Sequence, residues 1–326
     1  MLAKKAKTVE KAFGECYNRI NDQIDMGEIM KREDIRIRDP YIVAADGIYY
    51  MYSSTGSTDG TTVVVYKSED LDSWSEPVDV YKLDTSTWKS KELWAPEVHY
   101  YMGRYYMFLS ILGKNGLRGT EISVSDTPGG IFLPITDHPA TPEDKSCIDG
   151  TLFVDGDTPY IVYSRDWPDN YVAERDVYVG QICATQLTRD LKERVGDPFV
   201  LFESSEVPYS AAAPAHTKYR GEWLYRYGSD APFINRLRDG RIFLTWSPIP
   251  NNNYVVLGAV SENIRGPWTH IDVPLFDENG GHAMFFNGFD GQRKMCMHQP
   301  ERYPLERAVI FDVIETSDGL RIKNGI

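Results

Sequence analysis

The stretch that decides the fold is residues 37–42 (IRDPYI), which is followed at once by residues 46–54 (DGIYYMYSS). An acidic residue stands just before a proline, and a turn and a strand rich in aromatic residues come next. The same order returns at residues 94–108, 148–163 and 229–246. We interpret this pattern as a repeated unit that delivers an acidic residue to one place.

The repeat has the length of a propeller blade. Its aromatic runs begin near residues 48, 104, 159, 241 and 292, so the period is about 50 to 60 residues with one longer interval. Each unit contains several short β-rich runs separated by Gly, Asp, Asn, Pro and Ser. We therefore predict an all-β, five-bladed β-propeller over residues 35–326, with an insertion in the fourth unit that includes residues 211–216 and 222–227. A β-sandwich is less favoured, because sandwiches do not repeat a motif at blade length.

The N-terminal segment has a different pattern. Apolar side chains recur about every three or four positions in residues 8–32, which predicts a helical extension or cap over residues 1–34. This segment lacks the apolar core of a signal peptide, and no run approaches the ~20 apolar residues that cross a bilayer. We expect a cytoplasmic protein, or a secreted one if the native chain starts with a leader.

Composition restricts the partners. A net charge of −13 argues against nucleic acid and against an anionic membrane surface, and favours a neutral ligand. The 21 Tyr and 7 Trp residues exceed what a core needs, and such rings often line sugar sites, although most will pack in strand faces. The four cysteines are scattered without a CxxC pair, which indicates reduced, buried thiols.

The acidic residues of the repeats form a candidate site. The innermost strand of each propeller blade lines a central channel, so Asp39, Glu97, Asp149 and Asp230 are expected to converge there, with Glu206 just upstream of the fourth unit. Carboxylates that share a channel separate into protonated and ionised groups near neutral pH. Glycoside hydrolysis needs that separation, because one carboxyl protonates the leaving oxygen and another activates water. An isolated Asp before Pro or Gly is usually a turn residue, and only the recurrence favours a functional cluster.

In combination the motifs resemble the five-bladed propeller enzymes of glycoside hydrolase family 43, which act on arabinose-, xylose- and sometimes galactose-containing polysaccharides. Arg38-Asp39-Pro40 looks like the general-base motif of that family, and residues 94–97 (WAPE) look like its second-blade motif. Asp149 matches the residue that modulates the pKa of the acid. The resemblance implies an inverting hydrolase of arabinofuranosyl or xylosyl linkages in oligosaccharides or polysaccharides, with no cofactor required for the chemistry.

The general acid is where this chain departs from the family pattern, which has a Glu before Gly-Pro or Ala-Pro. Asp230 has the right position, in SDAPF, but a shorter side chain, whereas Glu206 has the right residue type about two dozen positions earlier. We predict Glu206 as the acid, because an Asp would fall about one C–C bond short of the leaving oxygen. Asp230 is the alternative.

Further residues are candidates for substrate or cation binding. Trp94 is expected to form a wall of the sugar site, and Glu97 and Tyr209 lie in or near motif loops. Arg165 could bond a sugar hydroxyl or pair with a carboxylate, and the ion pair is favoured. The resemblance places His282 near the channel axis, close to a structural Ca²⁺ or another cation, while a hydrogen bond to neighbouring backbone explains this His equally well.

Two other functions remain open at this point. The irregular acid motif suits a catalytically silent carbohydrate-binding propeller, which would bind glycans with unchanged affinity after Asp39→Asn. A propeller glycosidase of another type, cleaving galactosides, fructans or sialosides, is the other alternative. The sialoside version is disfavoured, because no repeated arginine motif is present to bind a substrate carboxylate.

Overall fold

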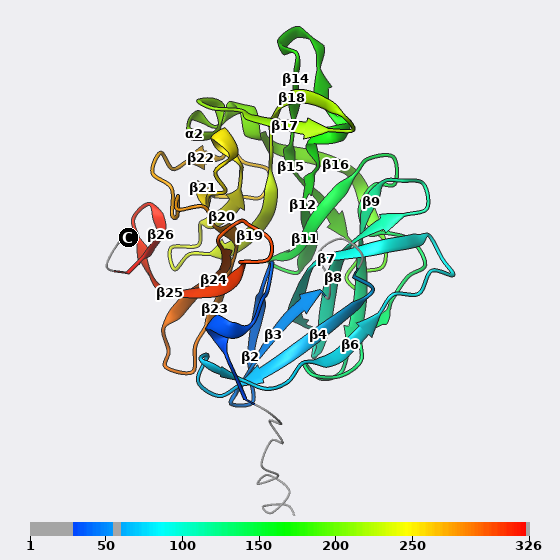
Figure 1. Ribbon diagram of the computed structural model, residues 1–326, viewed down its shortest axis with the longest axis vertical. Helices are drawn as coiled ribbons and strands as arrows, with labels where there is room; N and C mark the ends of the chain where they lie inside the picture. Colours follow the sequence, from blue (N-terminus) through cyan, green and yellow to red (C-terminus); the bar gives the residue numbers. More distant parts are fainter. Residues whose placement is uncertain (1–28, 55–59, 324–326) are drawn as a thin grey trace, which may run out of the picture.

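Five four-stranded antiparallel sheets form the body of the molecule in the computed structural model, which describes residues 29–54 and 60–323 (Figure 1). They follow one another along the chain as blades. Blade 1 contains β2 (Tyr41–Ala45), β3 (Ile48–Ser54), β4 (Thr62–Ser68) and β6 (Val78–Lys82), and blade 2 contains β7 (Lys89–Tyr101), β8 (Arg104–Gly113), β9 (Arg118–Ser125) and β10 (Leu133–Pro134). Blade 3 contains β11 (Cys147–Asp155), β12 (Thr158–Arg165), β15 (Gln181–Leu187) and β16 (Arg194–Glu203). Blade 4 contains β19 (Asp230–Arg236), β20 (Ile242–Ser247), β21 (Leu257–Ser261) and β22 (Thr269–His270), and blade 5 contains β23 (Gly281–Asn287), β24 (Arg293–Gln299), β25 (Arg307–Thr316) and β26 (Gly319–Ile322).

The inner strands form a ring. In each blade the first strand along the chain lies at one edge of its sheet, and these five strands are β2, β7, β11, β19 and β23. Each contacts the inner strand of the next blade, and β23 contacts β2. The predicted five-bladed β-propeller is therefore confirmed.

The aromatic runs of the repeat are the second strands of the blades. They begin at Ile48, Arg104, Thr158, Ile242 and Arg293, close to the predicted starts. All six residues of β20 are buried, as are five consecutive residues of β8. The second strand is apolar because neighbouring strands and blades cover it, and this made the repeat visible in the sequence.

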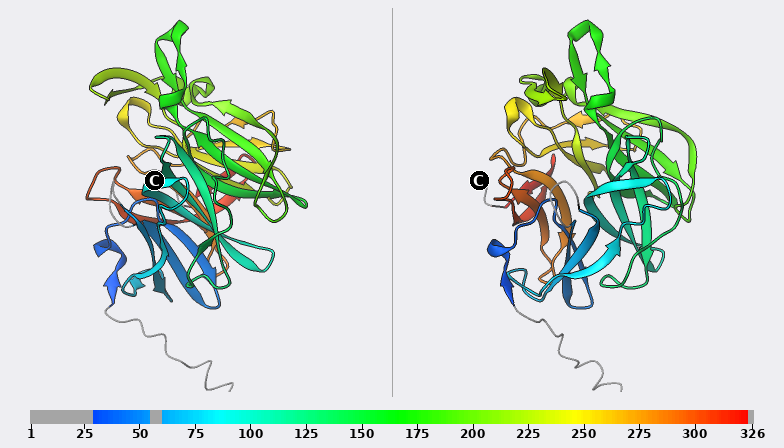
Figure 2. Two further views of the ribbon diagram at one scale, coloured as in Figure 1. Left: turned by 90° about the vertical axis from the view of Figure 1, so that its right-hand side faces the viewer. Right: turned by 45° about the vertical axis from the view of Figure 1, so that its right-hand side comes forward.

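The predicted insertion is built from two segments rather than one. β13 (Tyr171–Val172) and β14 (Val177–Val179) interrupt blade 3 between β12 and β15, and β17 (Ala215–Tyr219) and β18 (Glu222–Tyr227) lie between blades 3 and 4. The four strands form one small sheet in which β14 pairs with β18 in parallel. Figure 2 shows this inserted sheet at one end of the molecule.

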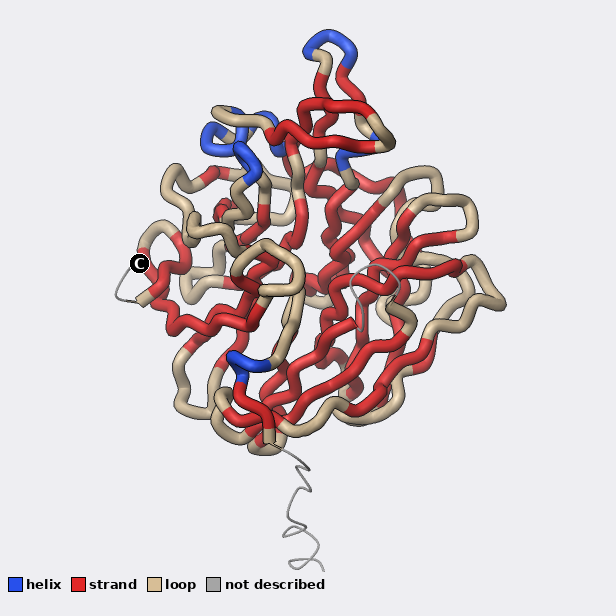
Figure 3. Tube along the Cα trace, in the orientation of Figure 1, coloured by secondary structure: helices blue, strands red, loops and turns tan. Residues whose placement is uncertain are grey.

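In the described part of the chain, helix is confined to single turns, most of them near the inserted sheet (Figure 3). They are η1 (Arg32–Asp34), η2 (Trp167–Asp169), η3 (Ala173–Arg175), η4 (Ser204–Glu206), α2 (Pro208–Ala211) and η5 (Pro250–Asn252).

The predicted N-terminal helical extension falls mostly on residues 1–28, outside the described part of the chain. Its last residues are not an α-helix. Met30–Lys31 forms the strand β1, which pairs with β5 (Ser73–Trp74), and η1 follows. Pairing with blade 1 therefore overrides the helical periodicity at this end of the segment.

The hydrophobic core lies between the blades. Its largest fully buried side chains include Trp74 and Trp246. Cys147, Cys183 and Cys296 are buried free thiols, as predicted, while Cys16 lies outside the described residues. Within residues 29–54 and 60–323, none of the helices has the length and apolar character to span a bilayer.

Candidate active site

One residue at or just before each inner strand has a left-handed backbone. The φ angles are 49° at Asp39, 46° at Ala95, 54° at Asp149, 54° at Ala231 and 58° at His282. In β7, β11, β19 and β23 this residue lies where the pairing register with the next strand shifts, at a β-bulge. Such a conformation costs a non-glycine residue about 1–3 kcal/mol, and it persists where surrounding structure enforces it. Its occurrence in all five blades marks this end of the channel as a functional site.

The bulges define which residues of the repeats are equivalent. Asp39 and Asp149 both occupy the left-handed position, but Asp230 lies one residue before it and Glu97 two residues after it. The sequence pattern treated the four acidic residues as equivalent. Relative to the left-handed residue of their blades, Asp230 and Glu97 occupy other backbone positions than Asp39 and Asp149 do.

A pocket of about 440 Å³ lies at this ring, and all five blades contribute to it. Its lining includes Arg38, Asp39, Trp94, Asp149, Asp230 and His282. Five of the predicted site residues, counting the alternative acid, are thus brought together from positions more than 240 residues apart in the chain.

Asp39 lies beside Arg38 and two imidazoles. Its Oδ1 lies 3.1 Å from Nδ1 of His282 and 3.1 Å from Nδ1 of His298, and its Oδ2 lies 3.6 Å from Nε of Arg38. Burial would raise the pKa of Asp39, but the positive charges of His282 and Arg38 and the two close imidazoles bring it well below its usual value. Asp39 is therefore ionised at neutral pH, as a general base must be.

Asp149 links the base to the fourth blade. Its backbone N–H donates to Oγ of Ser110 at 2.7 Å, and its Oδ2 accepts a hydrogen bond of 2.9 Å from the backbone N–H of Ala231. Burial raises the pKa of Asp149, as does the charge of Asp39, and these effects outweigh the opposing charge of His282.

Asp230 has the opposite electrostatic environment to Asp39. Burial raises its pKa well above the usual value, and the charges of Asp149 and Asp166 raise it further against the opposing charge of Arg226. The pKa of Asp166 is itself raised to about 6, mainly by burial. The pocket therefore holds one carboxyl group whose pKa is lowered, Asp39, and two whose pKa values are raised, Asp149 and Asp230.

The structure does not bring Glu206, the predicted acid, to this pocket. Glu206 is exposed at the end of η4, and its Oε2 accepts a hydrogen bond of 3.2 Å from the backbone N–H of Glu203. Together the two residues form a capping box for this short helix. The capping box explains Glu206 structurally, and of the two candidate acids only Asp230 lines the pocket.

Trp94 and Glu97, both from β7, occupy different depths. Trp94 lines the pocket, and the guanidinium Cζ of Arg118 lies 3.1 Å from the centre of its ring. Glu97 is 3% exposed, and its Oε2 lies 3.1 Å from Nε2 of His99. Trp94 can therefore contact a bound sugar. Glu97 is buried and can act on the pocket only through its negative charge.

Arg165 and Tyr209 are not among the residues that line the pocket. Arg165 donates to Oε1 of Gln181 at 3.0 Å and to the backbone oxygen of Asp169 at 3.4 Å, both uncharged acceptors. Tyr209 lies in α2 and packs against a hydrophobic cluster beside blade 4.

His282 lines the pocket with its imidazole against Asp39. Burial would lower its pKa, but the charges of Asp39 and Asp149 raise it to about 10, which makes it a cation at neutral pH. Among residues 29–54 and 60–323, no group of three or more His, Cys, Asp or Glu side chains is arranged to hold a metal ion. The described side chains thus do not by themselves form a cation site around His282, and that expectation stays a prediction.

Sequence reasoning missed a second His beside the base. His298 is fully buried on β24, and its Nε2 lies 2.6 Å from Oε2 of Glu301, whose Oε1 accepts a hydrogen bond from Arg38 at 2.9 Å. The ring of Tyr254 stacks on His298 with centroids 5.6 Å apart. These residues lie outside the inner strands, so the repeat gave no signal for them. Only the pairing of Gly281 with His298 places this His next to the channel.

Comparisons with known proteins show the family to which this chain belongs. Residues 34–320 match the family described as glycosyl hydrolases family 43. The chain belongs to this family. The crystal structure of an endo-arabinase from Bacteroides thetaiotaomicron is 33% identical, with a TM-score of 0.76, over 91% of this chain and 98% of that one.

Other family 43 members are more distant. Xylosidase/arabinosidase 43A of Humicola insolens is 23% identical over 239 residues, which span 65% of this chain and 72% of that protein. A β-xylosidase/α-arabinofuranosidase from a compost microbial metagenome shares the fold, with 18% identity and a TM-score of 0.67, over 92% of this chain and 97% of that one. Its structure is described as a calcium-free form in complex with xylotriose.

Proposed function

We propose that this family 43 protein hydrolyses arabinofuranosyl or xylosyl linkages in plant-type oligosaccharides or polysaccharides, with inversion at the anomeric carbon. Asp39 is the general base, Asp230 the general acid, and Asp149 holds and tunes the acid. The acid thus differs from Glu206, which the sequence favoured.

One observation carries the proposal. Asp39 and Asp230 line the same pocket, and their surroundings displace their pKa values in opposite directions. A pair of carboxyl groups with separated pKa values identifies the acid and the base of a glycosidase.

The reaction follows from these protonation states. The Asp39 carboxylate takes a proton from a water molecule while the water oxygen attacks the anomeric carbon. At the same time Asp230 gives its proton to the glycosidic oxygen, and the bond between that oxygen and the anomeric carbon breaks. Asp230 ends as a carboxylate and Asp39 as a carboxylic acid, so a proton transfer through solvent resets the site.

Pentose linkages are the favoured substrates because of the relatives. The 33% identical structure is described as an endo-arabinase, and the Humicola insolens protein as a xylosidase/arabinosidase. The aromatic wall at Trp94 suits the weakly apolar C–H face of a sugar ring.

A substrate screen tests the proposal. Aryl α-L-arabinofuranosides, β-D-xylosides and galactosides would be incubated with the purified protein, and the Asp39→Asn variant serves as the blank. We expect turnover of an arabinofuranoside or a xyloside, and NMR of the first-formed product should show inverted configuration. Retained configuration would remove Asp39 from the role of base. Glycan binding without hydrolysis would favour the silent binding propeller instead.

A further inference from the structure

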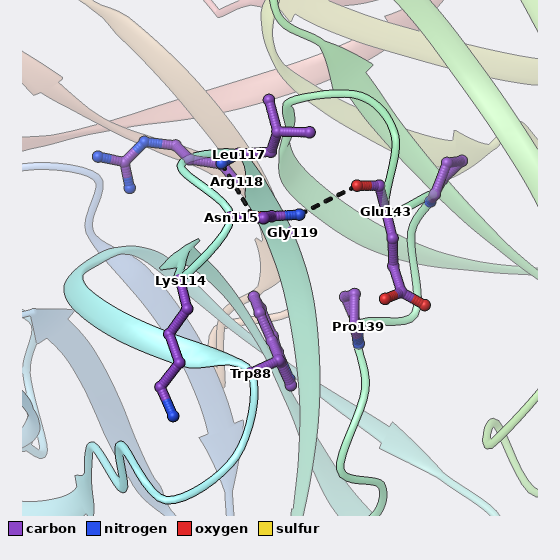
Figure 4. A pocket seen from close by; sticks show the side chains of 9 residues that line it. Trp88, Lys114, Asn115, Leu117, Arg118, Gly119, Pro139 and Glu143 are labelled. Carbon is purple, nitrogen blue, oxygen red and sulfur yellow. Dashed lines mark hydrogen bonds between the residues drawn. The ribbon is translucent and has the colours of Figure 1, made fainter.

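A second hollow lies outside the catalytic pocket, on blade 2. It has a volume of about 210 Å³ and is lined by Trp88, Lys114, Asn115, Arg118, Pro139 and Glu143, among others (Figure 4). The residues come from the segment before β7, the turn between β8 and β9, and the loop that precedes β11. We propose that this hollow binds one further sugar unit of the carbohydrate chain whose linkage is cleaved in the pocket. The inference rests on the proposed function.

The size of the hollow decides the class of ligand. A water molecule occupies about 30 Å³ of liquid, so the hollow has room for a ligand several times the size of a water molecule. Sites for drug-sized ligands are usually about 300–1,000 Å³, so it is too small for a large cofactor. A single monosaccharide ring fits between these limits.

Trp88 gives the hollow an aromatic wall. Its ring packs against the backbone of two glycines: a Cβ at Gly119 would lie 3.3 Å from Cη2 of Trp88, and one at Gly113 would lie 3.4 Å from Cε3. The indole Nε1 is buried and has no hydrogen-bond partner among the described residues. This nitrogen is out of reach of a ligand, so Trp88 offers a sugar the apolar surface of its half-buried ring.

The polar groups of the hollow suit a neutral polyhydroxy ligand. Figure 4 shows Lys114 and Glu143 on opposite sides of Trp88, and Arg118 also lines the hollow, so the lining carries charges of both signs rather than one. Sugar hydroxyl groups can accept from the ammonium group and donate to the carboxylate. A phosphate or a metal ion would instead meet one repulsive charge.

The hollow is pre-formed by bonds between its loops. Asn115 accepts a hydrogen bond of 3.0 Å from the backbone N–H of Leu117 and donates one of 3.2 Å to the backbone oxygen of Glu143. On the other side, the backbone N–H of Ala140 donates to the oxygen of Thr120 at 2.7 Å. Little conformational freedom is therefore lost when a ligand enters, which favours binding.

Arg118 joins the hollow to the catalytic pocket. It lines the hollow, and its guanidinium lies on the ring of Trp94, which lines the pocket. An ion pair with Glu92 and burial of all but 8% of its side chain hold Arg118 in this place. In this proposal the carbohydrate chain leaves the pocket at Trp94 and passes beside Arg118 to the hollow. Contacts at both places raise affinity because the second contact is intramolecular.

The test compares substrates that do and do not reach the hollow. In the full-length protein, Trp88→Ala removes the wall, and Glu143→Trp fills the hollow from an exposed position. For a longer arabino-oligosaccharide or xylo-oligosaccharide we expect each variant to raise KM about ten-fold, a loss of about 1.4 kcal/mol, with kcat unchanged. Hydrolysis of the aryl monoglycoside should stay as in the unmodified chain. Tyr100→Ala is the matched control, because Tyr100 is an exposed aromatic residue near the other end of β7.

Binding measurements separate this inference from the proposed function. Calorimetry with the Asp39→Asn protein reports oligosaccharide affinity without turnover, so the second site can be tested even if no tested glycoside is hydrolysed. Unchanged affinity in both Trp88→Ala and Glu143→Trp would overturn the inference. Equal losses for the aryl monoglycoside and the oligosaccharide would also overturn it, and the melting temperature of each variant shows whether such a loss reflects unfolding.

Discussion

The carboxylate of Asp149 accepts a hydrogen bond of 2.9 Å from the backbone N–H of Ala231, the residue that follows Asp230. Both Asp149 and Ala231 have the left-handed backbone that recurs in every blade. The bond therefore ties the bulge of blade 3 to that of blade 4 and fixes the direction in which Asp230 leaves its strand. In the proposed mechanism, the residue that tunes the acid also positions it, through charge and through this bond.

Replacing the base is expected to remove activity without unfolding the protein. Asp39→Asn keeps the size of the side chain but loses the proton acceptor, so kcat/KM should fall by about 10²–10⁴. The control is Asp155→Asn, the same change at a half-exposed site paired with Arg236, where surface ion pairs contribute about 0–1 kcal/mol. Initial rates and circular dichroism check both variants. Retained activity in Asp39→Asn would contradict the assignment.

Two matched amide variants distinguish the candidate acids. Asp230→Asn should reduce hydrolysis of natural oligosaccharides by about 10²–10⁴, and less for an aryl glycoside whose leaving group departs without a proton. Glu206→Gln should turn over both substrates at nearly the unmodified rate, because Gln can still accept the capping bond from Glu203. The opposite result, with Glu206→Gln inactive and Asp230→Asn active, would restore Glu206 as the acid.

The alkaline limb of the pH profile should move in opposite directions in two variants. Activity requires protonated Asp230 and is lost as pH rises through its raised pKa. Asp166→Asn removes a negative charge that opposes ionisation of Asp230, so the limb should move to lower pH. Arg226→Gln removes a positive charge that favours ionisation, so the limb should move to higher pH. The acidic limb of the profile reflects protonation of Asp39 and should stay at the same pH in both variants. Measuring kcat/KM against pH checks these expectations.

A buried ion pair in blade 2 predicts a large loss of stability. Lys89 and Glu121 form a salt bridge with exposures of only 1% and 0%, and Ser123 donates to the same carboxylate at 2.9 Å. Lys89→Met would leave Glu121 charged and unpaired, at a cost of about 3–5 kcal/mol in the free energy of unfolding. The double variant Lys89→Met/Glu121→Leu should recover much of that loss. Urea denaturation measures both, and a neutral single variant would show that the pair is not needed.

The repeat made the fold predictable, because a blade must bury its second strand between neighbours. The aromatic runs of β3, β8 and β12 record that burial at regular spacing. The helical periodicity of residues 8–32 does not hold at its described end, because Met30–Lys31 pairs with β5 as a strand and this pairing outweighs local preference. The inserted sheet could not be read as one unit, since its halves lie on either side of β15 and β16 in the chain.

The sequence by itself predicted a five-bladed propeller and identified Asp39 and Asp149 as candidate site residues. It could do so because the period and the Asp-Pro and Asp-Gly turns are local features. The tertiary structure alone decided which carboxyl faces them. Glu206 and Asp230 are both acidic and both precede the fourth blade, but only Asp230 lies beside the bulge that directs a side chain into the pocket. The pKa of each carboxyl depends on burial and on charges from other blades, such as His282 on Asp39 and Asp149 on Asp230. Those neighbours are distant in sequence, so no local pattern could decide between Glu206 and Asp230 as the acid.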